Sequence, residues 1–176
     1  MWNEQYDISL VNAGGNGNIP ARYQDRYQNG ADELVLVFCD TEKKPHEQYE
    51  DIKRKINEFH GVHNAADEVI MFGNPCTMQI ISKHWTDENL KSLAKKTNAP
   101  IIKKYTGVEN YKGREDQIRE VMEHVTEENY VDMCQRVRNL ESNDAVTGSS
   151  NFGKFIKLFE SDDSSWIEEI NGTLEM

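Results

Sequence analysis

Six consecutive apolar residues, Leu34 to Cys39 (LVLVFC), constrain the fold of this chain more than any other feature. Most of them favour strands, and an unbroken apolar run is typical of a strand covered on both faces of a parallel sheet. Asp40 and Glu42 follow at once, and ligands of open parallel sheets bind at the carboxyl ends of the strands. We therefore expect a buried strand over Leu34 to Asp40 that delivers this acidic pair to the functional edge of an α/β sheet.

Strand-like and helix-like segments alternate up to residue 112. Short apolar runs predict further strands at Asp7 to Val11, Val69 to Phe72 and Ala99 to Lys103. Proline starts, caps and apolar stripes predict helices from Pro20, over Tyr49 to Phe59, over Pro75 to Trp85 and over Glu88 to Lys96. This alternation is typical of a doubly wound sheet, so we expect a three-layer α/β domain of about four parallel strands over residues 1–112.

The remainder of the chain has only helical patterns. Two apolar stripes predict a helical hairpin packed on the domain over residues 113–141, and the polar stretch 142–151 reads as a linker. Residues 152–176 form a C-terminal helical segment with an aromatic face made of Phe152, Phe155, Ile156 and Phe159. If that face is exposed, we expect it to dock a protein partner, because contiguous apolar surface seldom goes unused.

The charge of the chain is strongly acidic but unevenly spread. A net charge of −11 disfavours nonspecific binding along duplex DNA, which depends on Lys and Arg neutralising phosphates. Between Lys83 and Arg114, however, eight Lys and Arg residues stand against three Asp and Glu residues. Lys103, Lys104, Lys112 and Arg114 are the predicted phosphate contacts of a local basic patch. A solvated surface of mixed charge explains the same pattern.

The composition places the chain among cytoplasmic proteins. Its 37% hydrophobic residues contain no apolar run near the roughly 20 residues that span a bilayer, and the first ten residues do not resemble a leader. The three cysteines form no CxxC pair, so reduced thiols are expected. We predict no membrane association.

Three features could carry chemistry. Asp40 and Glu42 could hold Mg²⁺ or Mn²⁺, or they could simply precede and cap the next helix. Gly14, Gly15 and Gly17, in the stretch NAGGNGN, could present backbone amides to a phosphate, or could form a plain tight turn. In the stretch NPCTMQIISKH, Asn74 is expected at the same sheet edge as Asp40, whereas the position of His84 on the apolar side of a helix also fits a histidine at the edge of the core with one hydrogen-bond partner.

Two of these motifs resemble the RloB-like branch of the Toprim fold, which is shared by topoisomerases, primases and phage-defence nucleases. The first is an apolar strand followed by FCDTE, and the second is GNPCTMQIISKHW with Asn74, Pro75, Cys76 and His84 matching. The resemblance implies that Asp40 and Glu42 bind a divalent metal for phosphodiester chemistry, with His84 as a catalytic residue and Asn74 shaping the site. The family's glutamate on an earlier strand has no counterpart here, and Met78 stands where the family has an acidic residue.

Two functions follow as hypotheses. The first is Toprim-like, metal-dependent phosphodiester hydrolysis of the nuclease type. The protein would then serve in phage defence, or it would be a degenerate relative that has lost the activity. The second is a non-catalytic protein-interaction domain of phage or mobile-element origin. Metal binding at Asp40 would distinguish them.

Overall fold

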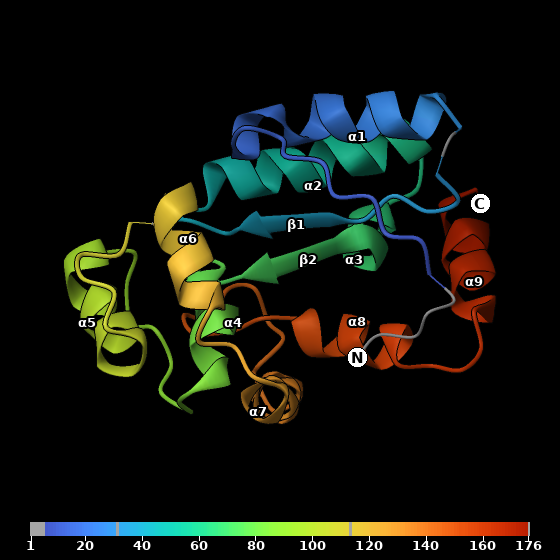
Figure 1. The fold of residues 1–176 in the computed structure, drawn as a ribbon. Coiled ribbons are helices and arrows are strands. Elements are labelled where there is room, and N and C mark those ends of the chain that lie inside the picture. Colours follow the sequence, from blue (N-terminus) through green and yellow to red (C-terminus); the bar gives the residue numbers. More distant parts are fainter. Residues whose placement is uncertain (1–5, 31, 113, 176) are drawn as a thin grey trace. The chain divides into compact units, whose positions relative to one another are not determined.

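A computed structural model describes residues 6–30, 32–112 and 114–175 of the chain (Figure 1). Its described residues are mostly helical, and they form two compact units. Unit 1 comprises the described residues of Met1–Met71 and Lys154–Met176, and unit 2 comprises those of Phe72–Gly153. Each unit is described by itself below.

Unit 1 is built around a helical pair and a short strand. Figure 1 shows helices α1 and α2 side by side next to strand β1. The elements are a 3-10 helix η1 (Asn16–Asn18), α1 (Ile19–Gln28), β1 (Val37–Asp40), α2 (Glu47–His60), α3 (Ala65–Val69), the start of β2 (Ile70–Gly73), most of α8 (Phe152–Phe159), and α9 (Ser165–Leu174).

The predicted three-layer sheet of about four strands is wrong. The described residues contain one sheet of two parallel strands, β1 and β2. Strand β1 covers only Val37–Asp40, and its burial alternates, with Val37 and Cys39 buried while Phe38 is 46% exposed. Alternating burial means that one face of the strand is covered, and not both. Leu34, Val35 and Leu36, before it in the apolar run, are half-buried and lie outside the sheet.

Two other predicted strands are wrong for different reasons. Asp7 to Val11 has no regular structure, and its Leu10 side chain is 93% exposed, so no core face selects a strand there. Ala99 to Lys103 lies inside a helix, α5 (Lys95–Thr106). There Asn98, Ile102 and Thr106 are buried at a spacing of four residues, which is the period of a helix.

The two N-terminal helices of unit 1 meet at a buried tyrosine and a histidine. Tyr23 of α1 is buried, and its hydroxyl lies 2.8 Å from Nε2 of His60 at the end of α2. Burial lowers the pKa of His60, and a hydrogen bond to the Leu174 backbone opposes that effect. His60 therefore links α1, α2 and the C-terminal end of α9.

We expect the free energy of unfolding to fall as the pH drops through about 6.5, the usual pKa of histidine in an unfolded chain. The folded state holds His60 neutral, so the unfolded state takes up the proton first, and stability declines until the folded pKa is passed. Urea unfolding at several pH values measures this, and His60→Gln should flatten the slope. His124→Gln, which replaces an exposed histidine, is the control and should keep it.

Unit 2 is helical and surrounds its own small core. Its elements are α4 (Met78–Ile81), a 3-10 helix η2 (Ser82–His84), α5, α6 (Glu115–Met122) and α7 (Glu127–Arg138). The core residues Ile102, Val108, Tyr111 and Val121 are buried together, and Trp85 packs against them. The segment predicted to form a helical hairpin contains the helices α6 and α7, and Thr126 caps α7 by accepting a hydrogen bond from the Asn129 backbone.

The predicted helix over Glu88 to Lys96 is wrong because side chains occupy its backbone groups. The Lys83 ammonium donates to the carbonyl oxygens of Asp87 and Glu88, at 2.7 and 3.1 Å. The Leu90 amide donates to the Gln79 side chain at 2.7 Å. Groups that would bond within a helix are thus satisfied elsewhere, and a helix starts only at Lys95.

The aromatic face predicted to dock a partner is buried in α8. Phe155 and Ile156 are fully buried, and Phe152 and Phe159 nearly so. Within unit 1, Phe159 also makes an edge contact with the Trp166 ring, at 5.6 Å between centroids. The prediction of a protein-docking surface there is therefore wrong. No helix among the described residues is long and apolar enough to cross a membrane.

Candidate functional site

The glycine-rich loop and the acidic pair lie next to each other in unit 1. Asn16, in η1, donates from Nδ2 to the carbonyl oxygen of Asp40 at 2.9 Å and to Oε1 of Glu42 at 3.4 Å. Gly14 and Gly15 have φ values of 72° and 127°, which side chains rarely tolerate, so glycine is needed for the turn that brings Asn16 there. Two features predicted separately are thus brought together. Gly17 lies in η1 with open space around it.

The segment that follows β1 has a strained backbone. Glu42 and His46 have φ values of 61° and 63°, in the left-handed region. The His46 ring places Nδ1 2.9 Å from the Thr41 carbonyl oxygen. The Thr41 hydroxyl oxygen and His46 Nε2 are buried and have no hydrogen-bond partner among the described residues. Cys39, in β1, is buried, and this burial raises the thiol pKa to about 12, so it is unreactive at neutral pH.

Metal binding at the acidic pair stays a prediction. No three His, Cys, Asp or Glu side chains gather as a metal site in the part of the chain that the structure describes. A metal at Asp40 and Glu42 would therefore have two carboxylates from the protein, with water filling the other positions, as Mg²⁺ accepts. The Glu42 carboxylate also lies beside the predicted phosphate loop, and it would repel a phosphate that arrived without a cation.

Asn74 is a structural residue of unit 2. Its side chain is buried and donates to the Asp144 carbonyl oxygen at 2.6 Å. Its backbone bonds to Ser149 and to Gly148, each at 3.0 Å. All these contacts hold the segment 144–149 in place. Asn74 and His84 belong to unit 2, whereas Asp40 and Glu42 belong to unit 1.

His84 presents one nitrogen as a hydrogen-bond acceptor. Its Nδ1 lies 2.9 Å from the Ile81 carbonyl oxygen, and a carbonyl can only accept, so Nδ1 carries the proton and Nε2 carries the lone pair. Burial is the main cause that lowers the pKa of His84, so the ring is neutral at pH 7. Arg136 of α7 donates to the His84 carbonyl oxygen at 3.1 Å and thereby fixes the end of η2.

Sequence reasoning missed a buried polar network in unit 2. Gln79 is fully buried, and its side chain bonds to Asn89, Leu90 and Gly148 at 2.7 to 2.8 Å. Lys83 is also buried, and it donates to the same Asn89 side chain at 2.7 Å. Both residues lie in the stretch predicted as a helix, where polar residues at non-stripe positions are normally exposed. No local pattern in the sequence marks them as buried.

The lysines of α5 form a continuous exposed surface. Among the residues of this helix whose burial is described, Lys96, Thr97, Pro100, Lys103 and Lys104 are exposed, and they lie opposite its buried side. We call Lys96, Lys103 and Lys104 the lysine face. Lys103 pairs with Glu109 at 2.6 Å, and both side chains stay more than half exposed. An exposed pair of this kind is weak, so a phosphate can displace Glu109.

The other predicted phosphate contacts are less suited to the task. Arg114 makes a salt bridge with Asp116 at 3.2 Å on the surface of unit 2. Lys112 is exposed, and its backbone amide donates to Gln117 at 2.8 Å. The structure therefore favours the lysine face as the centre of the basic patch, with Lys112 and Arg114 outside it on the segment leading into α6.

Aromatic rings border the lysine face. The rings of Trp85 and Tyr105 are nearly parallel, with an interplanar angle of 14° and centroids 6.3 Å apart. Lys104 Nζ lies 4.9 Å from the centroid of the Tyr105 ring. Side-chain hydrogen bonds lower the pKa of Tyr105, with Thr86 making the larger contribution and Lys104 the next. The C-terminal end of α5 thus combines positive charge with half-buried aromatic surface.

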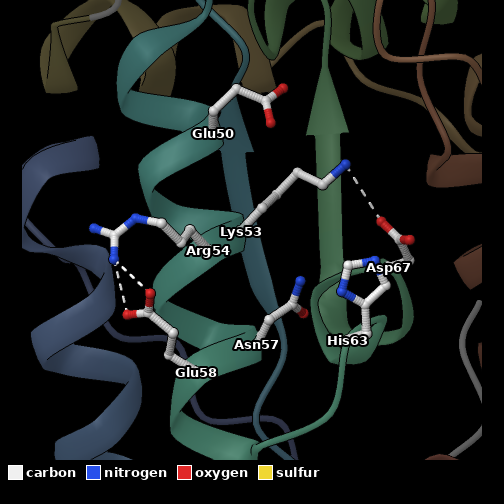
Figure 2. Close-up of a pocket in the computed structure, with 7 residues that line it drawn as sticks. All are labelled: Glu50, Lys53, Arg54, Asn57, Glu58, His63 and Asp67. Atoms are coloured by element: carbon white, nitrogen blue, oxygen red, sulfur yellow. Dashed lines mark hydrogen bonds and ion pairs between the residues drawn. The ribbon is translucent and has the colours of Figure 1, made fainter.

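An open surface hollow of about 480 Å³ lies on α2 in unit 1 (Figure 2). The charges in it pair with one another: Arg54 bonds to Glu58 at 2.7 Å, and Lys53 lies 3.4 Å from Asp67. Asn57 accepts from the Ala66 amide at 2.8 Å and so holds the start of α3. Three carboxylates, those of Glu50, Glu58 and Asp67, lie with two cations, Lys53 and Arg54, and the interactions in the hollow hold α2 to α3.

The comparisons with known proteins give one partial similarity. Transcriptional regulators MraZ from three strains of Coxiella burnetii are 26% identical to this chain over 103 residues, which is 56% of the chain. The match covers 62% of each regulator, so the chain spans less than two thirds of the relatives it matches. No family model matches the chain, and no solved structure matches it.

Proposed function

We propose that this chain is a non-catalytic regulatory protein that binds nucleic acid through the lysine face of α5. The observation that carries the proposal is the exposure of Lys96, Lys103 and Lys104 on one side of a single helix in an otherwise acidic chain. Proteins neutralise the phosphates of nucleic acids with Lys and Arg arranged in such clusters. The partial similarity to transcriptional regulators supports a regulatory role.

Metal-dependent phosphodiester hydrolysis is not proposed. It was motivated by the prediction of a Toprim-like sheet of about four strands, and that prediction is wrong. The nuclease assignment that depended on it is wrong as well. Binding of Mg²⁺ or Mn²⁺ at Asp40 and Glu42 stays a prediction of the sequence, as does cytoplasmic localisation. The proposed function needs neither.

Fluorescence anisotropy with labelled oligonucleotides, over about 50 to 200 mM salt, tests the proposal. The variant replaces Lys96, Lys103 and Lys104 with Gln, which removes the charge without placing a new acid beside Glu109. We expect binding to weaken by about tenfold or more at the lowest salt, because each lysine that no longer neutralises a phosphate reduces the electrostatic attraction. The slope of log affinity against log salt should become shallower by roughly 0.7 to 0.9 for each phosphate that is no longer neutralised.

A matched control keeps the change in net charge the same. Lys43, Lys44 and Lys157 are exposed lysines of unit 1, and replacing all of them with Gln should leave binding close to that of the original protein. Circular dichroism checks that both variants fold. If the original protein binds no oligonucleotide, or if the two variants bind equally well, the proposal is wrong.

A further inference from the structure

The acidic character of the whole chain limits what the lysine face can do by charge alone. The lysine face has three positive charges with which to attract a polyanion, and the whole protein has a net charge of −11. Long-range repulsion therefore offsets part of the local attraction. A protein of this charge binds nucleic acid well only if contacts that do not depend on charge add to the affinity.

The rings beside the lysine face can supply such contacts. Tyr105 follows Lys104 directly, and its ring runs nearly parallel to that of Trp85. The His84 ring lies next to Trp85, with centroids 5.4 Å apart and an interplanar angle of 42°. All three rings are half-buried, so each is held by packing and still reaches solvent. Rings held in this way present a surface on which a flat, unpaired base can stack.

The polar groups around the rings fit a base and its phosphate. His84 Nε2 carries a lone pair that can accept a hydrogen bond from the amino or imino group of a base. Lys104 lies over the Tyr105 ring, so a phosphate bound by Lys104 places the attached nucleotide close to that ring. Duplex DNA hides its base faces within the helical stack and cannot use this surface.

We propose that the aromatic group formed by His84, Trp85 and Tyr105 makes the lysine face selective for single-stranded nucleic acid. This inference rests on the proposed function, and it adds the class of ligand. The lysines bind the backbone, and at least one unpaired base stacks on Tyr105 and Trp85. Stacking needs only an accessible base face, and every base has one. The surface therefore tolerates any base.

Anisotropy titrations with an oligothymidylate and with a hairpin duplex of matched phosphate number test this inference. We expect the single strand to bind about tenfold more tightly than the duplex at the same salt. Tyr105→Leu should weaken single-strand binding by about tenfold and leave duplex binding unchanged. Tyr105→Phe keeps the ring and should bind the single strand like the original protein. Phe38→Leu, which changes an exposed ring of unit 1, is the control and should have no effect.

The outcomes separate this inference from the proposed function. Duplex binding as tight as single-strand binding, or single-strand binding unaffected by Tyr105→Leu, overturns the selectivity. In that case, loss of duplex binding in the triple lysine variant would still support the proposed function. If the original protein binds neither oligonucleotide at about 50 mM salt, both are overturned.

Discussion

Replacing Gln79 with Leu should lower the free energy of unfolding by about 3 to 4 kcal/mol. The Gln79 side chain accepts from the buried Leu90 amide at 2.7 Å and donates to the buried Gly148 carbonyl oxygen at 2.8 Å. Leucine has a similar volume but no polar atoms, so both backbone groups would lose their partner away from water. Each such group costs about 1 to 3 kcal/mol.

Hydrophobicity alone would predict a gain in stability, because leucine favours a buried site. The expected loss comes instead from the two backbone groups left without a partner. Chemical unfolding followed by circular dichroism measures it. Gln28→Leu is the matched control, since Gln28 is exposed at the end of α1 and the same change should stay within about 0.5 kcal/mol. A Gln79→Leu protein as stable as the Gln28→Leu protein would show that water replaces the missing hydrogen bonds, and that the network is not a source of stability.

The same network explains why local patterns misplaced the structure of unit 2. The sequence around Glu88 to Lys96 has an acceptable helix start and charged residues, and nothing nearby in the sequence competes with a helix. The competition comes from Lys83 and Gln79, whose side chains take the backbone groups of residues 87–90. Contacts of this kind depend on tertiary packing and leave no periodic signal.

The strands show a different limit. Val37–Asp40 lies within one predicted strand and Ile70–Gly73 overlaps another, because dense β-branched and aromatic runs favour strands in most contexts. The number of strands could not be predicted, because a short apolar run such as Ala99 to Ile102 suits a strand or the buried side of a helix equally well. A helix with a long stripe, such as α2, was predicted close to its observed position.

The candidate sites were predictable only in part. Charge counting found the basic segment that contains the lysine face, because clustering of Lys in an acidic chain is visible in the sequence. The sequence could not tell that Tyr105 and Trp85 lie parallel beside it, since they are far apart along the chain. Asp40 and Glu42 were predicted with the strand, but their contact with Asn16 depends on the turn at Gly14 and Gly15.

Replacing Gly73 with Ala should destabilise the protein by about 2 to 3 kcal/mol or prevent folding. A Cβ atom at Gly73 would lie 2.6 Å from the Cys76 carbonyl oxygen and 3.0 Å from the Thr77 Cα. Both are backbone atoms, so no side chain can turn aside to relieve the overlap, and the end of β2 must shift. That shift would displace Asn74, whose side chain and backbone together bond to the segment 144–149.

Gly172→Ala tests whether the effect comes from space and not from loss of glycine as such. Gly172 lies exposed in α9, and a Cβ there meets no atom within 4 Å. Alanine favours a helix over glycine by about 0.5 to 1 kcal/mol, so this variant should be more stable than the original protein. Urea unfolding of both variants should therefore shift in opposite directions. A shift of both in the same direction, or a Gly73→Ala protein of unchanged stability, would contradict the close packing at the end of β2.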